Sequence, residues 1–455
     1  MREIFKAYDV RGRYPRQINE KVVRLVALAA AEELADGAVI IGRDNRPSSP
    51  SLREALTEGL LAAGREVIDL GVVSTPMLYF ASRHLPDVAG AIMITASHNP
   101  PTDNGLKFTR ADAVPIASGS GLEQIRDRTE RLSLSQPSFD AKKGGCRREY
   151  DIKPEYFRFL SSFADLGKKR FSLTIDCANA VGALELPIFE ENLRENLSVD
   201  RLYCDPTSTE TPHEANPLKT STLDDLRRRV LERKADLGVA YDGDADRVGF
   251  VNERGEVVSM DLIGALVARR ILERNPGETV LYDLRSSMAV PETIEKSGGR
   301  AVECRVGHAF IKKQMRQEGA IFAAELSGHY YFRQNACAEL PTAVVLSLLA
   351  SMAESGRSLS ELAAELPAYH HSGEINSAVS DPAAILARLS EIYADGHRSD
   401  LDGLKVSYWD RPPGERWWFS VRSSNTEPLL RLNLEADTPE MLAAKKEELL
   451  QVIRA

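Results

Sequence analysis

Three segments of this 455-residue chain share one pattern, in which a run of small apolar residues passes abruptly into polar residues. The segments are LPDVAGAIMITASHN at 85–99, KADLGVAYDGDADR at 234–247 and EGAIFAAELSGH at 318–329. A short apolar run of this kind is typical of a buried strand in a parallel sheet, and α/β proteins bind ligands at the carboxyl ends of such strands. The repetition therefore predicts three similar α/β domains that each direct one strand end at a common cleft.

Helical patterns separate the predicted strands. Residues 19–36 form an amphipathic pattern capped by Asn19. A second helix begins at Ser49-Pro50, with Ser49 as its cap and Pro50 in its first turn, and ends at Gly64. Short strands at 39–42 and 66–70 alternate with them. The same alternation continues with a helix at 222–233 and strands at 171–176, 279–283, 301–306 and 320–324. Alternating strands and helices predict mixed, mainly parallel sheets with helices on both faces.

The pattern changes after about residue 370. The segments 404–408, 417–421 and 429–434 alternate as antiparallel strands, and Thr438-Pro439 caps a final helix. We therefore predict three similar, mainly parallel α/β domains and a smaller C-terminal α+β domain around a central cleft. The expected domain limits are 1–145, 146–250, 251–368 and 369–455.

Composition excludes several classes of protein. The net charge of −9 disfavours nucleic acid or an anionic membrane as a partner. No apolar stretch approaches the ~18 residues of a membrane span, and the N-terminus lacks the apolar core of a signal peptide. Five scattered cysteines fit unpaired thiols in a reducing compartment, and we expect Cys177 and Cys204 to be packing residues. These features predict a cytoplasmic protein.

The first polar loop, TASHNP at 95–100, places Ser97 where its strand ends. A hydroxyl at the carboxyl end of a strand, beside His98 and ahead of a Pro-Pro pair that stiffens the turn, is suited to be a nucleophile. An ordinary polar loop is the alternative, because Ser, Asn and Pro are common turn residues.

The second polar loop contains Asp242, Asp244 and Asp246. In an extended segment these side chains would face one way, and three like charges so close repel one another unless a cation holds them. Oxygen ligands indicate a hard ion, Mg²⁺ or Ca²⁺. An EF-hand is disfavoured because its sixth position is Arg247 and its flanks are strand-like. A solvated acidic turn remains the alternative.

Four motifs carry a family resemblance: TASHNP at 95–100, DGDADR at 242–247, ELSGH at 325–329 and RSSNTEP at 422–428. In this order they resemble the α-D-phosphohexomutases, most closely the bacterial phosphomannomutase/phosphoglucomutase branch. The resemblance implies an isomerase of carbohydrate metabolism that moves a phosphoryl group between the 1- and 6-positions of a hexose. It also implies a phosphoserine, Mg²⁺ and a glucose or mannose 1,6-bisphosphate activator. The four domains would carry, in order, the phosphoserine, metal, sugar and phosphate loops.

The resemblance also implies roles for individual residues. Ser97 would carry the phosphoryl group and, with Asp242, Asp244 and Asp246, ligate the metal. Lys107 is the first candidate for the acid/base role, which requires a lowered pKa. The other expected catalytic residues are His98 and Arg247. The expected substrate-binding residues are Tyr8, Arg11, Arg285, Gly307, His308, Glu325, Ser327, Arg422, Ser424, Asn425 and Thr426.

Other residues near these motifs are assigned supporting roles or left open. Residues 42–44 and Arg46 are expected to brace the serine loop. His329 is equally compatible with a structural role. Ala323-Ala324 stand where the family often has glycine, and 336–341 lacks the family's usual sequence.

The sequence leaves three other functions to weigh. A phosphoglucosamine mutase usually has Gly and Gln where this chain has Ala245 and Leu326. A sugar phosphatase using Ser97 needs no second phosphate clamp, and a non-catalytic sugar-phosphate binding protein needs neither Ser97 nor three aspartates. The choice between mannose and glucose, and between monomer and dimer, stays open.

Overall fold

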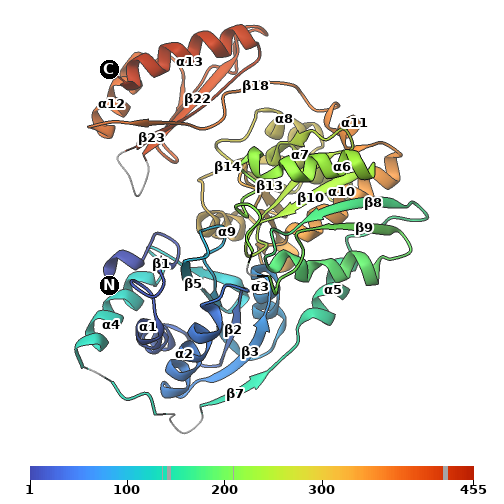
Figure 1. The fold of residues 1–455 in the computed structure, drawn as a ribbon. Helices are drawn as coiled ribbons and strands as arrows, with labels where there is room; N and C mark the ends of the chain where they lie inside the picture. Colours follow the sequence, from blue (N-terminus) through green and yellow to red (C-terminus); the bar gives the residue numbers. More distant parts are fainter. Residues whose placement is uncertain (136, 141–144, 209, 424–428, 455) are drawn as a thin grey trace.

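The computed structural model describes residues 1–135, 137–140, 145–208, 210–423 and 429–454. The chain forms four β-sheets and completes each before it begins the next (Figure 1). Three mixed α/β domains followed by an antiparallel α+β domain confirm the predicted fold class. Within the described ranges, no helix is long and apolar enough to cross a membrane.

The first domain has the strand order β1-β5-β4-β2-β3-β7, with β6 beside β5. Asn19 caps α1 as predicted, by accepting a hydrogen bond from the Val22 amide. The predicted cap of α2 is wrong, because Ser48 precedes the helix and Ser49 donates to Asp44. The sheet extends past residue 145, since β7 pairs with β3. The elements are β1 (Val10–Arg13), α1 (Glu20–Glu33), β2 (Ala38–Arg43), α2 (Ser49–Ala62), β3 (Glu66–Val72), α3 (Thr75–His84), β4 (Val88–Ile94), β5 (Asp103–Arg110), β6 (Val114–Ile116), α4 (Leu122–Ser135) and β7 (Cys146–Glu149).

The second domain has the strand order β12-β11-β10-β8-β9. This sheet continues past residue 250, because β12 pairs with β11. The predicted helix at 222–233 is preceded by a short 3-10 turn and begins at Asp224. The elements are α5 (Lys153–Ser161), β8 (Phe171–Asp176), β9 (Leu197–Leu202), α6 (Asp224–Arg233), β10 (Leu237–Tyr241), β11 (Val248–Asn252) and β12 (Val257–Val258).

The third domain has the strand order β14-β13-β15-β16-β17. Its three predicted strands are present, although two of them are shorter than expected. The elements are α7 (Met260–Arg274), β13 (Thr279–Asp283), α8 (Ala289–Lys296), β14 (Arg300–Cys304), α9 (His308–Glu318), β15 (Phe322–Ala324), β16 (Tyr330–Phe332), β17 (Ala338–Glu339), α10 (Pro341–Ser355) and α11 (Leu359–Ala363).

The fourth domain is an antiparallel sheet with the order β18-β23-β22-β21-β20, and β19 pairs with β23. Thr438 caps the last helix as predicted, by accepting a hydrogen bond from the Met441 amide. The elements are β18 (His370–His371), β19 (Ile375–Ala378), α12 (Pro382–Ile392), β20 (His397–Ser399), β21 (Leu404–Ser407), β22 (Trp417–Ser423), β23 (Leu429–Ala436) and α13 (Pro439–Arg454).

Each of the first three sheets changes from parallel to antiparallel at one strand. β4 is parallel to β2 but antiparallel to β5, and β10 is parallel to β8 but antiparallel to β11. In the same way, β15 is parallel to β13 but antiparallel to β16. These antiparallel pairings make the sheets less parallel than predicted. They also explain the repeated pattern of an apolar strand followed by a polar loop. An antiparallel partner strand can follow after a short loop, so two paired strands of the sheet hold each polar loop at its two ends.

Five hydrophobic clusters stabilise the described parts of the four domains, and two of them show how the domains are joined. One runs through the first three domains and includes Ile40 of β2, Ile175 of β8 and Phe322 of β15. The fourth domain has its own core around Trp417 and Phe419. Figure 1 shows this domain, in orange and red, set apart from the first domain.

Polar contacts join the fourth domain to the third. The Glu435 carboxylate of β23 accepts hydrogen bonds from the Met288 amide and the Trp418 indole, both at 2.8 Å. Lys405 pairs with Glu303 on β14. Glu435 is fully buried, and its Oε1 atom has no hydrogen-bond partner. Burial raises the pKa of Glu435 to about 7.

We expect the Glu435→Gln variant to lose part of the protein's pH-dependent stability. The reference pKa of this carboxyl group is 4.5, below its value of about 7 in the folded protein. Its contribution to stability is therefore fully present at low pH and is lost as the pH rises through about 7, a difference of about 3 kcal/mol. The variant stays neutral and keeps an oxygen acceptor. Calorimetry near pH 5 and near pH 8 should show a smaller fall in Tm for the variant.

The exposed Glu391 of α12 provides the matched control. Glu391→Gln should leave the fall in Tm between the two pH values as it is in the unmodified protein. Equal falls in Tm for Glu435→Gln and the unmodified protein would contradict the assignment.

Candidate active site

Ser97 lies in the loop between β4 and β5. Its Oγ atom donates to Asp242 Oδ2 at 2.9 Å and lies 3.1 Å from His98 Nδ1. Its amide donates to Thr95 Oγ1 at 2.9 Å. The residue has a φ of 52°, in the left-handed region that a non-glycine residue adopts only when its surroundings hold it there. The loop therefore fixes the hydroxyl toward the aspartate loop of the second domain.

Arg46 braces the serine loop from the side. Its guanidinium donates to the carbonyls of Ser97 at 2.6 Å and Asn99 at 2.8 Å, and it pairs with Asp44 at 3.0 Å. The predicted bracing role is confirmed. On the other side, a Cβ on Gly243 would lie 2.2 Å from the Ser97 carbonyl oxygen, so this close approach of two loops requires glycine.

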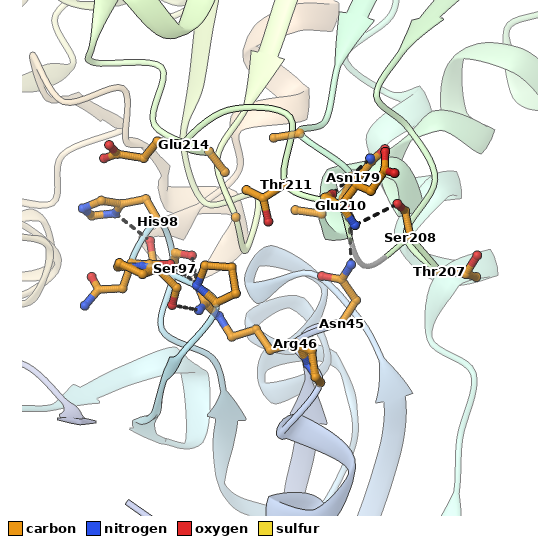
Figure 2. Close-up of a pocket in the computed structure, with 18 of the residues that line it drawn as sticks. Asn45, Arg46, Ser97, His98, Asn179, Thr207, Ser208, Glu210, Thr211 and Glu214 are labelled. Carbon is orange, nitrogen blue, oxygen red and sulfur yellow. Dashed lines mark hydrogen bonds between the residues drawn. The ribbon is translucent and has the colours of Figure 1, made fainter. Parts of the chain in front are cut away.

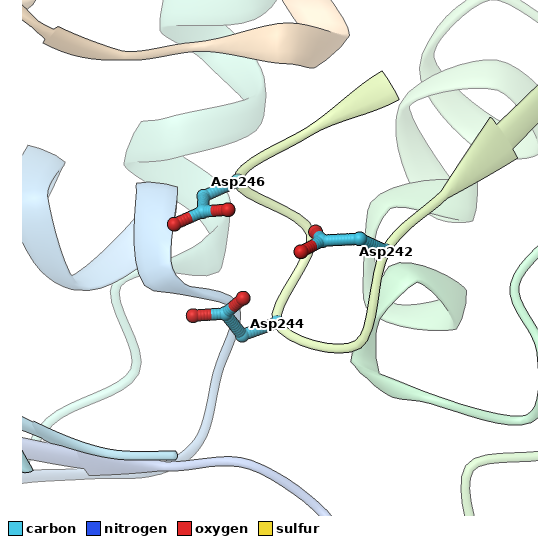
Figure 3. A group of neighbouring side chains, drawn as sticks. All are labelled: Asp242, Asp244 and Asp246. Carbon is cyan, nitrogen blue, oxygen red and sulfur yellow. The ribbon is translucent and has the colours of Figure 1, made fainter. Parts of the chain in front are cut away.

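Asp242, Asp244 and Asp246 converge on one point (Figure 3). One oxygen from each lies within 4.8 Å of the others, and each residue is at most 3% exposed. The expected extended conformation is wrong, because the chain turns at 243–244 and Ala245 has a φ of 58°. The turn still brings the carboxylates together. Its flanks are the paired strands β10 and β11, which excludes an EF-hand as predicted.

Burial and neighbouring charges perturb two of the three carboxylates in opposite directions. Burial and then the charges of Asp246 and Asp244 raise the pKa of Asp242 well above its usual value. Burial alone would raise the pKa of Asp246 as well, but Lys107, His329 and Arg247 together outweigh it, and the pKa of Asp246 falls well below its usual value. Asp244 Oδ1 and Asp246 Oδ1 are buried without hydrogen-bond partners. Unsatisfied carboxylate oxygens are costly, so this cluster fits a hard divalent cation.

Lys107 of β5 is the positive charge nearest to the three aspartates. Its Nζ atom donates to Asp244 Oδ2 and Asp246 Oδ2, both at 2.6 Å. Burial alone would lower the pKa of Lys107, but these carboxylates outweigh it and raise the pKa well above its usual value. Lys107 is thus held as an ammonium, whereas an acid/base role near neutral pH requires a lowered pKa. That role requires another cation to replace Lys107 on the two carboxylates.

A chain of hydrogen bonds links the aspartate loop to the ELSGH loop. Arg247 Nε donates to His329 Nε2 at 3.2 Å, and His329 Nδ1 lies 3.0 Å from Ser327 Oγ. Arg247 can only donate, so His329 Nε2 accepts in this contact, and Nε2 also lies 3.3 Å from Asp246 Oδ1. Ser327 in turn donates to Glu325 Oε2 at 3.0 Å. His329 therefore orients two of the expected substrate-binding residues.

Arg285 and Glu325 form a second charged group beside this chain. Arg285 pairs with Asp283 at 2.7 Å and lies 3.7 Å from Glu325 Oε2. Asp283 also accepts a hydrogen bond from the Leu326 amide at 2.9 Å, so it holds both the arginine and the ELSGH loop. Ala323-Ala324 replace the glycines that the family often has, and a glycine of α7 faces them: a Cβ on Gly264 would lie 2.5 Å from that of Ala324.

Tyr8, Gly307 and His308 meet at the border of the first and third domains. A Cβ on Gly307 would lie 2.5 Å from the Tyr8 hydroxyl, and the Tyr8 and His308 rings are 5.3 Å apart. Burial raises the pKa of Tyr8, and the charges of Glu325 and Arg422 also act on it. Tyr8 of the first domain therefore meets two expected binding residues of the third domain.

A buried ion pair that the sequence did not predict lies beside His308. Lys312, one turn further along α9, pairs with Glu339 Oε2 at 2.5 Å and lies 3.8 Å above the Tyr79 ring. Glu339 Oε1 is also 3.7 Å from His308 Nδ1. This pair gives the atypical segment 336–341 a role, because β17 presents Glu339 to α9. The signal in the sequence was the four-residue spacing of His308 and Lys312, which places them on one helix face.

Arg11 and Arg422 come from the first and fourth domains. Arg11 donates to Asn99 Oδ1 at 2.9 Å and pairs with Asp9 at 2.6 Å. Arg422, near the end of β22, pairs with Glu374 at 3.2 Å, and its buried Nε atom has no hydrogen-bond partner among the described residues. The remaining expected phosphate-binding residues, Ser424, Asn425 and Thr426, lie outside the described residues.

A cavity of about 810 Å³ adjoins the serine loop between the first two domains (Figure 2). Ser97 and His98 line one side, and Asn179, Glu210 and Glu214 line the side formed by the second domain. Asn45 reaches across and donates to the carbonyls of Asn179 at 2.8 Å and Pro206 at 3.0 Å. The sequence-based predictions contained no cavity here, because its walls come from segments far apart along the chain.

Four family models match the chain in sequence order, and together they span most of it. They are the phosphoglucomutase/phosphomannomutase alpha/beta/alpha domain I at 2–135, domain II at 154–255, domain III at 259–369 and the C-terminal domain at 374–452.

Known proteins match over nearly the whole length. A protein of Xanthomonas campestris described as a phosphohexose mutase is 36% identical over 457 residues, with 99% of each chain covered. The Pseudomonas aeruginosa phosphomannomutase/phosphoglucomutase is 34% identical, with 96% of this chain and 93% of that protein covered. Among solved structures, a phosphoglucomutase/phosphomannomutase family protein of Burkholderia thailandensis has a TM-score of 0.87 at 28% identity and covers 100% of this chain and 98% of that one.

These full-length matches agree with the structure in the family that they indicate. The structure has the buried aspartate cluster, and each of its three polar loops follows the strand at which its sheet changes from parallel to antiparallel. This chain belongs to the phosphoglucomutase/phosphomannomutase family.

Proposed function

We propose that this hexose-phosphate mutase transfers a phosphoryl group between the 1- and 6-positions of a hexose through Ser97. The observation that carries the proposal is the hydrogen bond from Ser97 Oγ to Asp242 Oδ2, 2.9 Å long, which joins a buried hydroxyl to a cluster of three buried carboxylates. A hexose 1,6-bisphosphate is the intermediate, and added glucose or mannose 1,6-bisphosphate restores the phosphoserine when the intermediate escapes.

The residues fit a Mg²⁺ ion. The buried oxygens of Asp242, Asp244 and Asp246, two of them without partners, are the hard ligands that this ion prefers, and a phosphoryl oxygen on Ser97 completes the set. When bound, the ion neutralises charge on the transferring phosphoryl group. Lys107 donates to the other oxygen of Asp244 and of Asp246, so the ion would share both carboxylates with Lys107 and weaken its hold on them, which would free Lys107 for the acid/base role.

His98 and Arg247 position the phosphoryl group. Burial, with the nearby charges of Arg247 and Arg11, lowers the pKa of His98 to about 2, so its ring is neutral. A neutral ring can donate from Nδ1 to Ser97 Oγ while Ser97 donates to Asp242. Arg247 lies 3.9 Å from both Asp242 and Asp246 and stays charged to meet a phosphoryl oxygen.

Glu325 and Ser327 hold adjacent hydroxyls of the sugar. Glu325 accepts from Tyr331 at 2.5 Å and from Ser327, which fixes the carboxylate and leaves its other lone pairs for the ligand. The intermediate must bind in two orientations, so the contacts should meet the third and fourth carbons, whose hydroxyls look alike in both. Mannose and glucose differ only at the second carbon, and we therefore propose that both phosphates are substrates.

Arg422 binds the phosphate that is not reacting. Its partly buried guanidinium pairs with Glu374, the residue before β19, and offers a planar fork suited to a phosphate. Tyr8, Arg11, Arg285, Gly307 and His308 complete the pocket, with Ser424, Asn425 and Thr426 assigned to the same phosphate. This second phosphate site separates a mutase from a phosphatase.

Ser97→Ala tests the transfer itself. We expect the unmodified protein to be partly phosphorylated by intact-mass spectrometry, and the variant to lose that mass. Coupled assays on mannose, glucose and glucosamine 1-phosphates, with catalytic glucose 1,6-bisphosphate, should show turnover of the first two sugars and a loss of about a thousandfold or more in the variant. The exposed Ser118→Ala is the matched control. Full turnover by Ser97→Ala would end the proposal, and preference for glucosamine phosphate would overturn the substrate assignment.

Asp244→Asn tests the metal site. Removing one carboxylate charge should raise the Mg²⁺ concentration for half-maximal activity by roughly tenfold or more, and should weaken Mn²⁺ binding measured by electron paramagnetic resonance. The fold should survive, since the change relieves repulsion. Glu232→Gln, an exposed change in the same domain, controls for net charge. Unchanged metal dependence and unchanged Mn²⁺ binding would point to another site.

Arg422→Ala tests the second phosphate site. Losing a charge-assisted contact costs ~1.5 to 3 kcal/mol, so kcat/KM should fall by roughly tenfold or more. The phosphoserine should remain, and the variant should need more added 1,6-bisphosphate because the intermediate escapes more often. Arg431→Ala is a matched control, since Arg431 pairs with the same Glu374 at 3.1 Å. An equal effect of both variants would show that only the ion pair with Glu374 matters.

A further inference from the structure

Two thiols from adjacent strands lie in contact at one edge of the second domain. Cys177 follows β8 and Cys204 follows β9, and their sulfur atoms are 3.2 Å apart. The strands are parallel neighbours in continuous register from Phe171 and Leu197 onward, so the sheet itself brings both cysteines to one edge. Both thiols are free. A disulfide bond is about 2.05 Å long, so bonding requires a movement of only about 1 Å.

The two thiols differ in accessibility. Cys177 is fully buried, and burial raises the pKa of its thiol well above the usual value. Cys204 is half-buried. A small oxidant therefore reaches Cys204 first, and Cys177 is placed to attack the oxidised sulfur from the interior.

The loops that follow both cysteines share one partner in the first domain. Asn45 donates to the carbonyl of Asn179, two residues after Cys177, and to that of Pro206, two residues after Cys204. The next residue, Arg46, donates to the carbonyl of Ser97. Figure 2 shows Asn45 and Arg46 with their partners Asn179 and Ser97. A change in the spacing of the two cysteine loops therefore acts on the loop that carries the reacting serine.

We propose that Cys177 and Cys204 form a reversible disulfide that slows the mutase reaction. With a peroxide as oxidant, the Cys204 thiolate attacks one peroxide oxygen, the O–O bond breaks and a sulfenic acid forms as hydroxide leaves. Cys177 then loses its proton and attacks the sulfenic sulfur, which forms the S–S bond and releases hydroxide that becomes water. Two thiols and one hydrogen peroxide thus give one disulfide and two waters, and a dithiol reverses the change.

The experiment uses the full-length enzyme, treated with hydrogen peroxide and then blocked with a thiol alkylator. Peptide mass spectrometry should find Cys177 linked to Cys204. Hexose-phosphate turnover should fall between about twofold and thirtyfold, the range expected for coupling through a chain of contacts, and dithiothreitol should restore it. Activity of the reduced enzyme reports separately on the proposed function, so failure of one does not imply failure of the other.

Three variants make the result decisive. Cys204→Ser, at the half-buried position, should fold, keep the turnover of the reduced enzyme and resist peroxide, and Cys177→Ala should behave in the same way. Cys146→Ser removes an exposed thiol on β7 and should stay sensitive. The proposal is overturned if no linked peptide forms, if the linked enzyme keeps full activity, or if Cys204→Ser is still reversibly inactivated.

Discussion

Repulsion among three buried carboxylates is the constraint on which the arrangement of domains depends. Asp242, Asp244 and Asp246 belong to the second domain, but the charges that offset them are supplied or held in place by the neighbouring domains. Lys107 arrives from the first domain, and Arg247 is held in place by His329 of the third. The loop therefore needs both neighbours. The apolar core shared by the first three domains supplies this fixed relation, because it packs strands of all three sheets into one cluster.

The fourth domain is attached through polar contacts and does not share the apolar core of the first three domains. Its core is separate, and its contacts with the third domain are polar: Glu435 with the Met288 amide, Lys405 with Glu303, and Trp409 with Glu292. Polar contacts can be exchanged for water at smaller cost than an apolar core can be opened. The groups proposed for the reacting phosphate thus lie on domains that share one apolar core, while Arg422 lies on a domain with a separate core.

The sequence allowed the fold class, the strand ends and most of the candidate site to be predicted, because each loop follows an apolar run whose residues can be read directly. Other features depended on backbone angles and distant partners. The φ of 58° at Ala245 turns the aspartate loop where alternation suggested an extended chain. Glu339 and Lys312 meet only because β17 folds beside α9. The contact between Cys177 and Cys204, expected to be packing residues, arises from the register of β8 and β9.

His329 links the aspartate loop of the second domain to the ELSGH loop of the third. Arg247 donates to His329 Nε2, and His329 Nδ1 lies against Ser327 Oγ. Ser327 in turn donates to Glu325, the carboxylate proposed to accept hydroxyls of the sugar. In the proposed function, a substrate that draws Arg247 toward its phosphoryl oxygens would break the first contact of this chain. His329 would then be a positioning residue that couples Arg247 of the second domain to Glu325 of the third.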